Sequence, residues 1–298
     1  MRHDVRFPSN GLMLAGHLYT PDSPTSELSP AIVVGHPTTG VKEQTPSLYA
    51  QRLAEEGYIA LTFDAAYQGG SEGEPRGLEN PFQRADDFRW AVSYLANRED
   101  VDPERIGVLG ICASGGYAPF AAQTDHRMKA VATVSAVDLP GFFRAGDPEG
   151  FNELVKQSGQ AYSDEVAGKP APLVPALPET ADASTPASVA EFVDYYKTPR
   201  AQHPCSTGMW ALRSAALLDQ YDSFARIDKI APRPLLMIAG TKAETLPFSE
   251  GAVAQAGDNA ELHLIEGATH VDLYDRDEYL APAVAKLVEF FNQNLTKG

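Results

Sequence analysis

One cysteine of this chain stands in a setting that is typical of a catalytic nucleophile. Cys112 lies in the stretch RIGVLGICASGGYA, residues 105–118, where an apolar run ends at Gly110 and a helical pattern begins. A chain that passes directly from a strand into a helix turns sharply, and the residue at the tip projects its side chain into the crevice at the strand ends. The tip needs small residues on either side, and here they are Gly110 and Ser114. The pattern predicts that Cys112 is a nucleophile.

A thiol suits this position physically. The N-terminus of the following helix places a partial positive charge beside the sulfur, and a nearby histidinium would lower the thiol pKa further. Two alternatives stay open. Cys112 can be a buried, inert side chain, as many cysteines are. The register can also be shifted, so that Ser114, framed by Cys112 and Gly116, is the nucleophile.

The partners of an elbow nucleophile are expected in the order acid, then histidine, each on a loop after a later strand. His270, in LIEGATHVDLYD, follows the last apolar run and a glycine, and is the predicted general base. Glu244, in IAGTKAETLP, is the predicted acid that orients the imidazole. Asp138 and Asp272 are the alternative acids.

An acyl-transfer site also needs donors for the negative charge that develops on the carbonyl oxygen. The backbone N–H of Ala113, at the helix N-terminus, is one expected donor. The second is expected in VVGHPTTGVKE, where Pro37 has no N–H and Thr38 is the next candidate. In neighbouring loops, His36 and Asp64 are expected to fix loop shape.

The elements that must position these residues follow an alternating pattern. Short apolar runs alternate with helical patterns, as in a parallel sheet that is buried on both faces. The first two strands flank Asn10-Gly11, a dipeptide typical of a tight hairpin. The other expected strands are 31–36, 59–65, 105–110, 130–137, 234–240 and 260–267, and the main expected helices are 46–56, 82–99 and 279–295. Eight strands predict an α/β protein with a mostly parallel sheet and helices on both faces.

The alternation stops between the sixth and seventh strands, over residues 140–230. This stretch is too long for a structureless loop, so we expect it to form a helical cap over one end of the sheet. Residues 188–198 and 206–227 are predicted to be helical, and the Pro/Ala-rich residues 167–188 to be extended. The predicted domains are a core of residues 1–139 and 231–298, and the cap insertion.

Composition limits the classes of partner. The chain has 298 residues and a formal net charge of −16, which argues against nucleic acid and anionic membranes as partners. No stretch reads as a signal peptide or membrane span, so a soluble cytoplasmic protein is expected. Its two cysteines make neither a disulfide framework nor a zinc site, and no metal or cofactor is expected. A homodimer is compatible with the sequence, which does not fix the oligomeric state.

Taken in order, the segments GHPTTG, TFDAAYQGGSEG, RIGVLGICASGG, IAGTKAE and EGATHVDLY resemble the α/β-hydrolase fold. The cysteine elbow is similar to that of the dienelactone hydrolase-like branch. The resemblance covers residues 1–140 and 230–298 and leaves the cap unmatched. It implies a Cys-His-acid triad, carried here by Cys112, His270 and Glu244, that acts on esters, lactones or thioesters. Larger proteins that resemble this chain act on polyketide or acyl thioesters.

The expected function is therefore cleavage of an ester, lactone or thioester through an acyl-enzyme on Cys112, with Ala113 and Thr38 as the oxyanion donors. Two alternatives use the same residues or the same fold. One is an acyltransferase that passes the acyl group from a thioester donor to an alcohol or amine. The other is a non-catalytic protein that binds a small molecule. Dehalogenase and epoxide hydrolase chemistry is disfavoured, because it would need an aspartate at the elbow.

Overall fold

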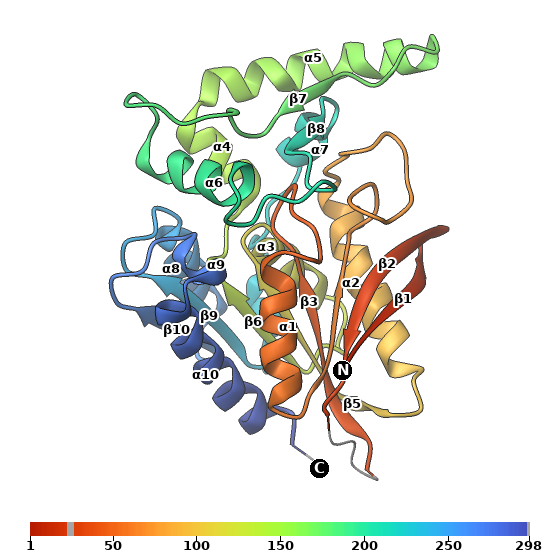
Figure 1. Cartoon of the computed structure of the whole chain (residues 1–298), viewed down its shortest axis with the longest axis vertical. Helices are drawn as coiled ribbons and strands as arrows, with labels where there is room; N and C mark the ends of the chain where they lie inside the picture. The colour runs from red at the N-terminus through yellow and green to blue at the C-terminus, as the bar shows by residue number, and fades with distance from the viewer. Residues whose placement is uncertain (23–26, 297–298) are drawn as a thin grey trace.

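The computed structural model describes residues 1–22 and 27–296, and its centre is one eight-stranded sheet (Figure 1). The strand order is β1-β2-β4-β3-β5-β6-β9-β10. The strands are β1 (Arg2–Ser9), β2 (Leu12–Tyr19), β3 (Ser29–Gly35), β4 (Ile59–Phe63), β5 (Val101–Ile111), β6 (Ala130–Val134), β9 (Leu235–Gly240) and β10 (Ala260–Ile265). The last six are mutually parallel, while β2 pairs with β1 and β4 antiparallel. The predicted count of eight strands and the mostly parallel sheet are confirmed.

The opening hairpin turns at Asn10-Gly11, as predicted. Both residues have positive φ, at 47° and 84°, which is the conformation that a two-residue hairpin loop of this twist requires. Strand β6 is shorter than predicted, because Ser135 has a φ of 48° and ends the extended run after Val134.

Helices cover both faces of the sheet. They are α1 (Thr45–Glu55), α2 (Pro81–Ala96), α3 (Ser114–Ala122), α8 (Leu246–Ala256), α9 (Asp272–Asp275) and α10 (Asp277–Asn294). Helix α1 packs beside α10 on one face, and α2 packs beside α3 on the other. None of the helices in the described part of the chain is long and apolar enough to cross a membrane.

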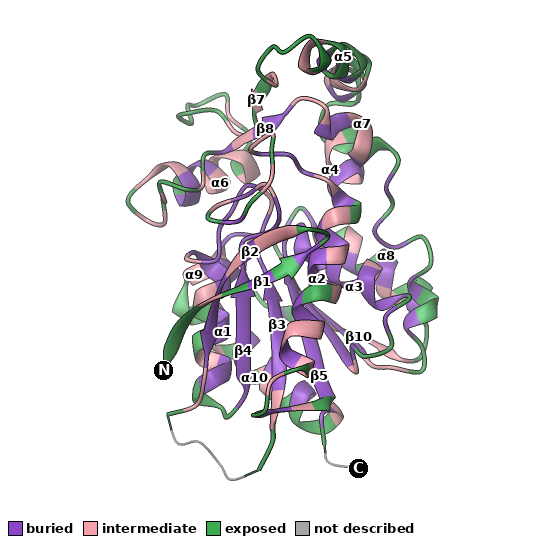
Figure 2. Ribbon diagram, turned by 90° about the vertical axis from the view of Figure 1, so that its right-hand side faces the viewer, coloured by how far each residue is buried: buried purple, intermediate pink, exposed green. Residues whose placement is uncertain are grey.

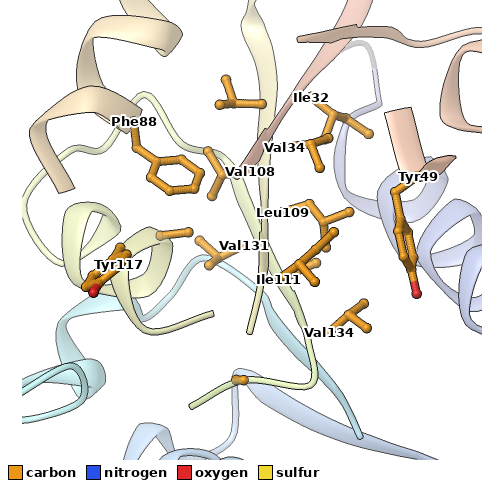
Figure 3. Packing of buried hydrophobic residues seen from close by; sticks show 14 of the residues in the cluster. Ile32, Val34, Tyr49, Phe88, Val108, Leu109, Ile111, Tyr117, Val131 and Val134 are labelled. Atoms are coloured by element: carbon orange, nitrogen blue, oxygen red, sulfur yellow. The ribbon is translucent and has the colours of Figure 1, made fainter. Parts of the chain in front are cut away.

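The core lies on both sides of the central strands, which are buried along most of their length (Figure 2). Figure 3 shows Phe88 of α2 and Tyr117 of α3 on one side of these strands and Tyr49 of α1 on the other. Val108 and Leu109 are adjacent in β5 and point to opposite faces, and both are fully buried. A strand segment buried on both faces needs apolar residues at every position, which explains the apolar run over residues 106–111 of β5.

The segment 140–230 lies over the carboxyl ends of the parallel strands (Figure 1). Its elements are α4 (Leu139–Gly146), α5 (Pro148–Val166), β7 (Leu173–Pro175), α6 (Ala187–Lys197), β8 (Met209–Ala211), α7 (Ser214–Asp219) and the 3₁₀ turn η1 (Ile227–Ile230). Strands β7 and β8 form a separate antiparallel pair. Helix α5 is largely exposed (Figure 2).

The structure matches some predictions for this segment and corrects one. Helix α6 lies where a helix was predicted. Of the Pro/Ala-rich residues 167–188, which were predicted to be extended, only Leu173–Pro175 form a strand, and the others include turns and bends. The helix predicted over 206–227 is wrong, because Met209–Ala211 pair with β7 and only Ser214–Asp219 form an α-helix. The Ala211 N–H also donates to the carbonyl oxygen of Gly77, at 3.0 Å, which holds the strand against the core. Helices α4 and α5 were not predicted.

Candidate active site

Cys112 lies at the sharp turn between β5 and α3, with a φ of 56°. Such a conformation costs a non-glycine residue about 1–3 kcal/mol and persists only where the surroundings impose it. Here they do, because a Cβ atom at Gly110 would come within 2.0 Å of the carbonyl oxygen of Ser114. A Cβ at Gly115 would come within 2.7 Å of Ala136. The turn therefore has the close packing expected of a nucleophile elbow.

Ser114, the alternative nucleophile, has its hydroxyl engaged elsewhere. Its side chain is 1% exposed, and its Oγ donates to the carbonyl oxygen of His36 at 2.6 Å. The same Oγ accepts a hydrogen bond from Arg84 at 3.1 Å. The hydroxyl thus ties α3 to the end of β3, and a serine is accommodated where a glycine is usual. The geometry favours Cys112 over Ser114 as the reacting residue.

The Cys112 thiol is protonated at rest, which differs from the expected activation. Burial raises its pKa to about 11, and three hydrogen-bond partners oppose that rise only partly. They are the Tyr274 hydroxyl and the backbone N–H groups of Ala113 and Thr38. The two predicted oxyanion donors therefore face the sulfur. The expected histidinium is absent as well, because burial lowers the pKa of His270 to about 3 and keeps its imidazole neutral.

His270 follows β10 and is 3% exposed. Its Nε2 is 3.0 Å from the hydroxyl of Tyr274, and its Nδ1 is 2.6 Å from Oγ1 of Thr245. Its ring also packs edge-on against Phe192, with centroids 5.1 Å apart. The structure therefore brings His270 and Cys112 to the same hydroxyl group, that of Tyr274.

No carboxylate of the described residues is hydrogen-bonded to His270, which corrects the expected geometry of the acid. Glu244 is exposed, and the neighbouring residue Thr245 takes the contact with Nδ1. Asp138 caps α4 and accepts from Ser223, while Asp272 accepts from the backbone of Thr269. Helix α8 begins at Leu246, so the chain turns inward at Thr245 and leaves the longer Glu244 side chain facing solvent.

Tyr274 was missed from the sequence. It lies four residues after His270, and its hydroxyl contacts both His270 and the Cys112 thiol. The ring is fully buried against the rings of Tyr195 and Tyr196, and its carbonyl oxygen accepts from Thr45 at 2.9 Å. The spacing of four residues from a candidate base is the one sequence signal that could have drawn attention to it.

The loop that carries Thr38 is anchored by a buried acidic side chain. Oγ1 of Thr38 donates to Glu79 at 2.9 Å, and the Tyr117 hydroxyl donates to the other oxygen of Glu79 at 2.9 Å. Arg84 lies 3.4 Å from the same carboxylate, and both charged side chains are almost fully buried. This network fixes the backbone N–H of Thr38 relative to α3 and the elbow.

His36 and Asp64 hold the same loop, as expected. The Ala65 N–H donates to Nε2 of His36 at 3.0 Å, so the ring proton is on Nδ1, which donates to the carbonyl oxygen of Pro37 at 2.6 Å. Burial keeps the pKa of His36 well below its usual value. Asp64 accepts from both the backbone and the ammonium of Lys42, at 2.7 and 2.8 Å.

A small cavity of about 60 Å³ lies over the sulfur. It is lined by Thr38, Thr39, Cys112, Val137, Leu139, Phe142, Phe143, Ala176, Leu177, Phe192, Tyr196, Trp210, Thr245 and His270. Most of these side chains are apolar, and several come from the segment 140–230. Tyr195 does not line the cavity, because its hydroxyl accepts from the Thr45 N–H at 3.0 Å. Apolar walls with a few polar groups among them are typical of a small-molecule site.

The sheet order, the elbow and the histidine after the last strand define an α/β-hydrolase. The chain belongs to the dienelactone hydrolase family, whose model matches residues 14–137. The uncharacterized protein YcjY of Escherichia coli is 37% identical over 271 residues, which are 89% of each chain. The crystal structure of the hypothetical protein PA2218 from Pseudomonas aeruginosa superposes with a TM-score of 0.90, at 35% identity, over 99% of this chain and 94% of that one.

More distant relatives carry the names of activities. The thiohydrolase aneE of Aspergillus aculeatus is 30% identical over 171 residues, which are 56% of this chain and 52% of that protein. The acyltransferase drtE of Aspergillus calidoustus is 25% identical over 94% of this chain and 91% of its own. Together with the family, these relatives show that the chain is an enzyme with a hydrolase-type function.

Proposed function

We propose that the protein cleaves an ester, lactone or thioester through an acyl-enzyme on Cys112. One observation carries the proposal: the sulfur sits at a strained elbow, faces two backbone N–H donors, and shares the Tyr274 hydroxyl with His270. A nucleophile, an oxyanion site and a base are the three parts that acyl transfer needs, and here they converge on one apolar cavity.

In the first step, Sγ of Cys112 attacks the carbonyl carbon as it loses its proton. The thiol proton passes to the Tyr274 oxygen, and the tyrosine's own proton passes to Nε2 of His270. The carbonyl oxygen becomes an oxyanion, which the N–H groups of Ala113 and Thr38 stabilise. The carbon–oxygen or carbon–sulfur bond to the leaving group then breaks. The leaving group takes the proton back from His270, and a thioester remains on the enzyme.

In the second step, water attacks the thioester and gives its proton to His270. The same two N–H groups hold the second oxyanion, which collapses with release of the acid. The Cys112 sulfur leaves and is reprotonated. Throughout both steps, Nδ1–H of His270 donates to Oγ1 of Thr245, which keeps Nε2 free to accept a proton. Thr245 takes the orienting part that sequence alone assigned to Glu244.

We also propose that residues 140–230 form a cap over a core of residues 1–139 and 231–298. This division is supported by the position of the segment over the strand ends (Figure 1). It is supported further by the contribution of Phe143, Trp210 and Phe192 to the cavity. A cap of this kind supplies apolar walls to the substrate site.

The test is capture of the acyl group. Wild type, Cys112→Ala and Cys205→Ala are mixed with p-nitrophenyl butyrate, and intact masses are recorded over the first turnovers. We expect a butyryl adduct on wild type and on Cys205→Ala, located at Cys112 by peptide mapping, and none on Cys112→Ala. Cys205 is an exposed thiol and so is a matched control. An adduct elsewhere, or turnover that persists in Cys112→Ala, would refute the proposal.

Acyl transfer to a second substrate is the alternative outcome of the same site. It is favoured by the burial of the reacting groups, since Cys112 and His270 are 4% and 3% exposed and water has little access. A full-length relative named as an acyltransferase supports it as well. Adding hexanol to the adduct distinguishes the two activities. A transferase forms hexyl butyrate faster than butyrate, and a hydrolase does not.

A further inference from the structure

The cavity over Cys112 borders a second, larger hollow that is lined mostly by the segment 140–230. This outer groove has a volume of about 960 Å³ and is open to solvent. Six residues line both spaces: Phe142, Phe143, Ala176, Leu177, Phe192 and Trp210. A ligand that reaches the sulfur therefore lies against side chains that also line the outer groove.

The walls of the outer groove are apolar and come from several elements. Phe151 and Leu154 are contributed by α5, Val174 by β7, Val189 by α6 and Phe248 by α8. Many of these side chains are half-buried, so they remain available to an apolar ligand. A flexible hydrocarbon chain is the ligand that such walls bind most readily.

The charges of the lining residues limit the class of ligand further. Of the described residues that line the inner cavity, none is a lysine, arginine, aspartate or glutamate, and His270 is neutral there. The charged residues that line the outer groove are Asp147 and Glu244, both acidic. Arg84 lies under the elbow, but Glu79 compensates its charge at 3.4 Å. A carboxylate in either space would have no cation beside it and would be repelled at the rim.

We infer that the outer groove binds the acyl chain of the substrate, and that this chain is long, apolar and uncharged. The inference rests on the proposed function and names its substrate class. The acyl group, unlike the leaving group, stays on Cys112 through both steps of the reaction. A groove that shares its wall with the cavity around the sulfur therefore contributes to both steps when the acyl chain occupies it.

The first experiment varies the acyl chain at a constant leaving group. The substrates are p-nitrophenyl acetate, butyrate and octanoate, and the mono-p-nitrophenyl ester of suberic acid, which matches octanoate in length and ends in a carboxylate. A fully buried methylene contributes about fourfold to kcat/KM. We expect kcat/KM for octanoate at least tenfold above that for acetate, and for the suberate ester at least tenfold below that for octanoate. Equal values along either comparison would overturn the inference.

A second series separates the acyl chain from the leaving group. Octyl acetate carries the same eight carbons on the alcohol side, and acetate release from it is compared with release from ethyl acetate. We expect little gain from the longer alcohol. A gain equal to that of the octanoate series would mean that the groove binds the leaving group instead.

Substitution of Val189, which lines the outer groove away from the sulfur, tests the charge argument. Val189→Lys places a cation in the groove, and Val189→Met is the uncharged control of similar length. We expect Val189→Lys to raise the suberate-to-octanoate ratio of kcat/KM at least tenfold over Val189→Met. Val166→Lys adds the same charge at a site that is 91% exposed on the end of α5, and should leave that ratio as in wild type.

Binding to Cys112→Ala keeps the inference testable without turnover. This variant is titrated with octanamide and with suberamate, its carboxylated counterpart, and the fluorescence of Trp210 is followed, with Trp210→Phe as the reference. We expect saturation with octanamide and at least tenfold weaker binding of suberamate. If octanamide does not bind while wild type forms an acetyl adduct, the groove inference fails and the proposed function stands. If octanamide binds but no ester acylates Cys112, the proposed function fails and the chain-binding groove stands.

Discussion

The two halves of the site are built in different ways. The nucleophile half consists of the elbow and the loop that carries Thr38, and it is held by a dense buried network. Glu79 alone accepts hydrogen bonds from two side chains and pairs with Arg84. Ser114 ties the elbow helix to the same loop. The side chains that bond to Glu79 and the hydroxyl of Ser114 all have buried partners, so the donors for the oxyanion are positioned before any substrate arrives.

The histidine half has fewer constraints. His270 is held by one hydroxyl on each ring nitrogen, Thr245 and Tyr274, and no described carboxylate supports it. Both imidazole and thiol are neutral at rest, because burial outweighs their partners. The comparison shows that the N–H donors for the oxyanion are in place before the reaction. The thiolate and the imidazolium, in contrast, form only during the reaction.

The largest expected effect comes from breaking the anchor of the nucleophile half. Arg84→Met leaves the buried carboxylate of Glu79 without its cation, and loss of one partner of a buried ion pair costs about 3–5 kcal/mol. Arg89→Met, on the same helix, breaks a partly exposed pair with Asp86 and should cost less than about 1 kcal/mol. Urea unfolding of the two variants measures the difference. Equal losses would show that the network does not anchor this half.

The resting protonation of Cys112 gives the next effect. A thiol with a pKa near 11 is almost entirely protonated at pH 8, so its alkylation by iodoacetamide should be at least about tenfold slower than that of Cys205. Because the pKa is raised, the rate at Cys112 should keep rising about tenfold per pH unit up to pH 10. Peptide masses after timed alkylation measure both cysteines in one sample. A plateau below pH 8 would mean that a thiolate is already present at rest.

Tyr274 connects the two halves, and removal of its hydroxyl tests that connection. Tyr274→Phe keeps the buried ring and should lower kcat/KM about 100-fold, the lower end of what a positioned acid or base contributes. Tyr195→Phe removes a neighbouring buried hydroxyl that bonds only to the backbone N–H of Thr45, and should change kcat/KM by less than about threefold. An unchanged kcat/KM in Tyr274→Phe would mean that the proton passes directly from the Cys112 sulfur to the imidazole of His270.

The contrast between the halves also explains how far sequence reasoning reached. The elbow is a local feature, because Gly110, Cys112 and the glycines after it must pack closely wherever a strand turns into a helix. The loop that carries Thr38 is local too, because it directly follows the end of a strand. The order of strands and helices could be predicted as well, because the hydrophobic pattern of each element is local in the sequence. The cap was harder, because Met209–Ala211 form a strand only through pairing with a distant segment.

The partners of His270 depend on tertiary packing to an even greater degree. Whether Glu244 or Thr245 turns inward is decided by where α8 begins, a matter of one residue, and element ends are the least certain part of any sequence interpretation. Tyr274 reaches the sulfur from α9, where its ring packs against the aromatic rings of Tyr195 and Tyr196 in α6. No local pattern encodes that contact.

The smallest expected effect decides which residue orients His270. Thr245→Val removes the hydroxyl at Nδ1 while keeping the shape of the side chain, and leaves a buried N–H without a partner, so kcat/KM should fall about 5–10-fold, equivalent to ~1–1.4 kcal/mol. Glu244→Gln removes the charge of the exposed neighbour and should change kcat/KM by less than about twofold. The order of the two effects matters more than their size. If Glu244→Gln is the more damaging change, the glutamate must turn inward to His270 during turnover, and the histidine half is completed only when substrate is bound.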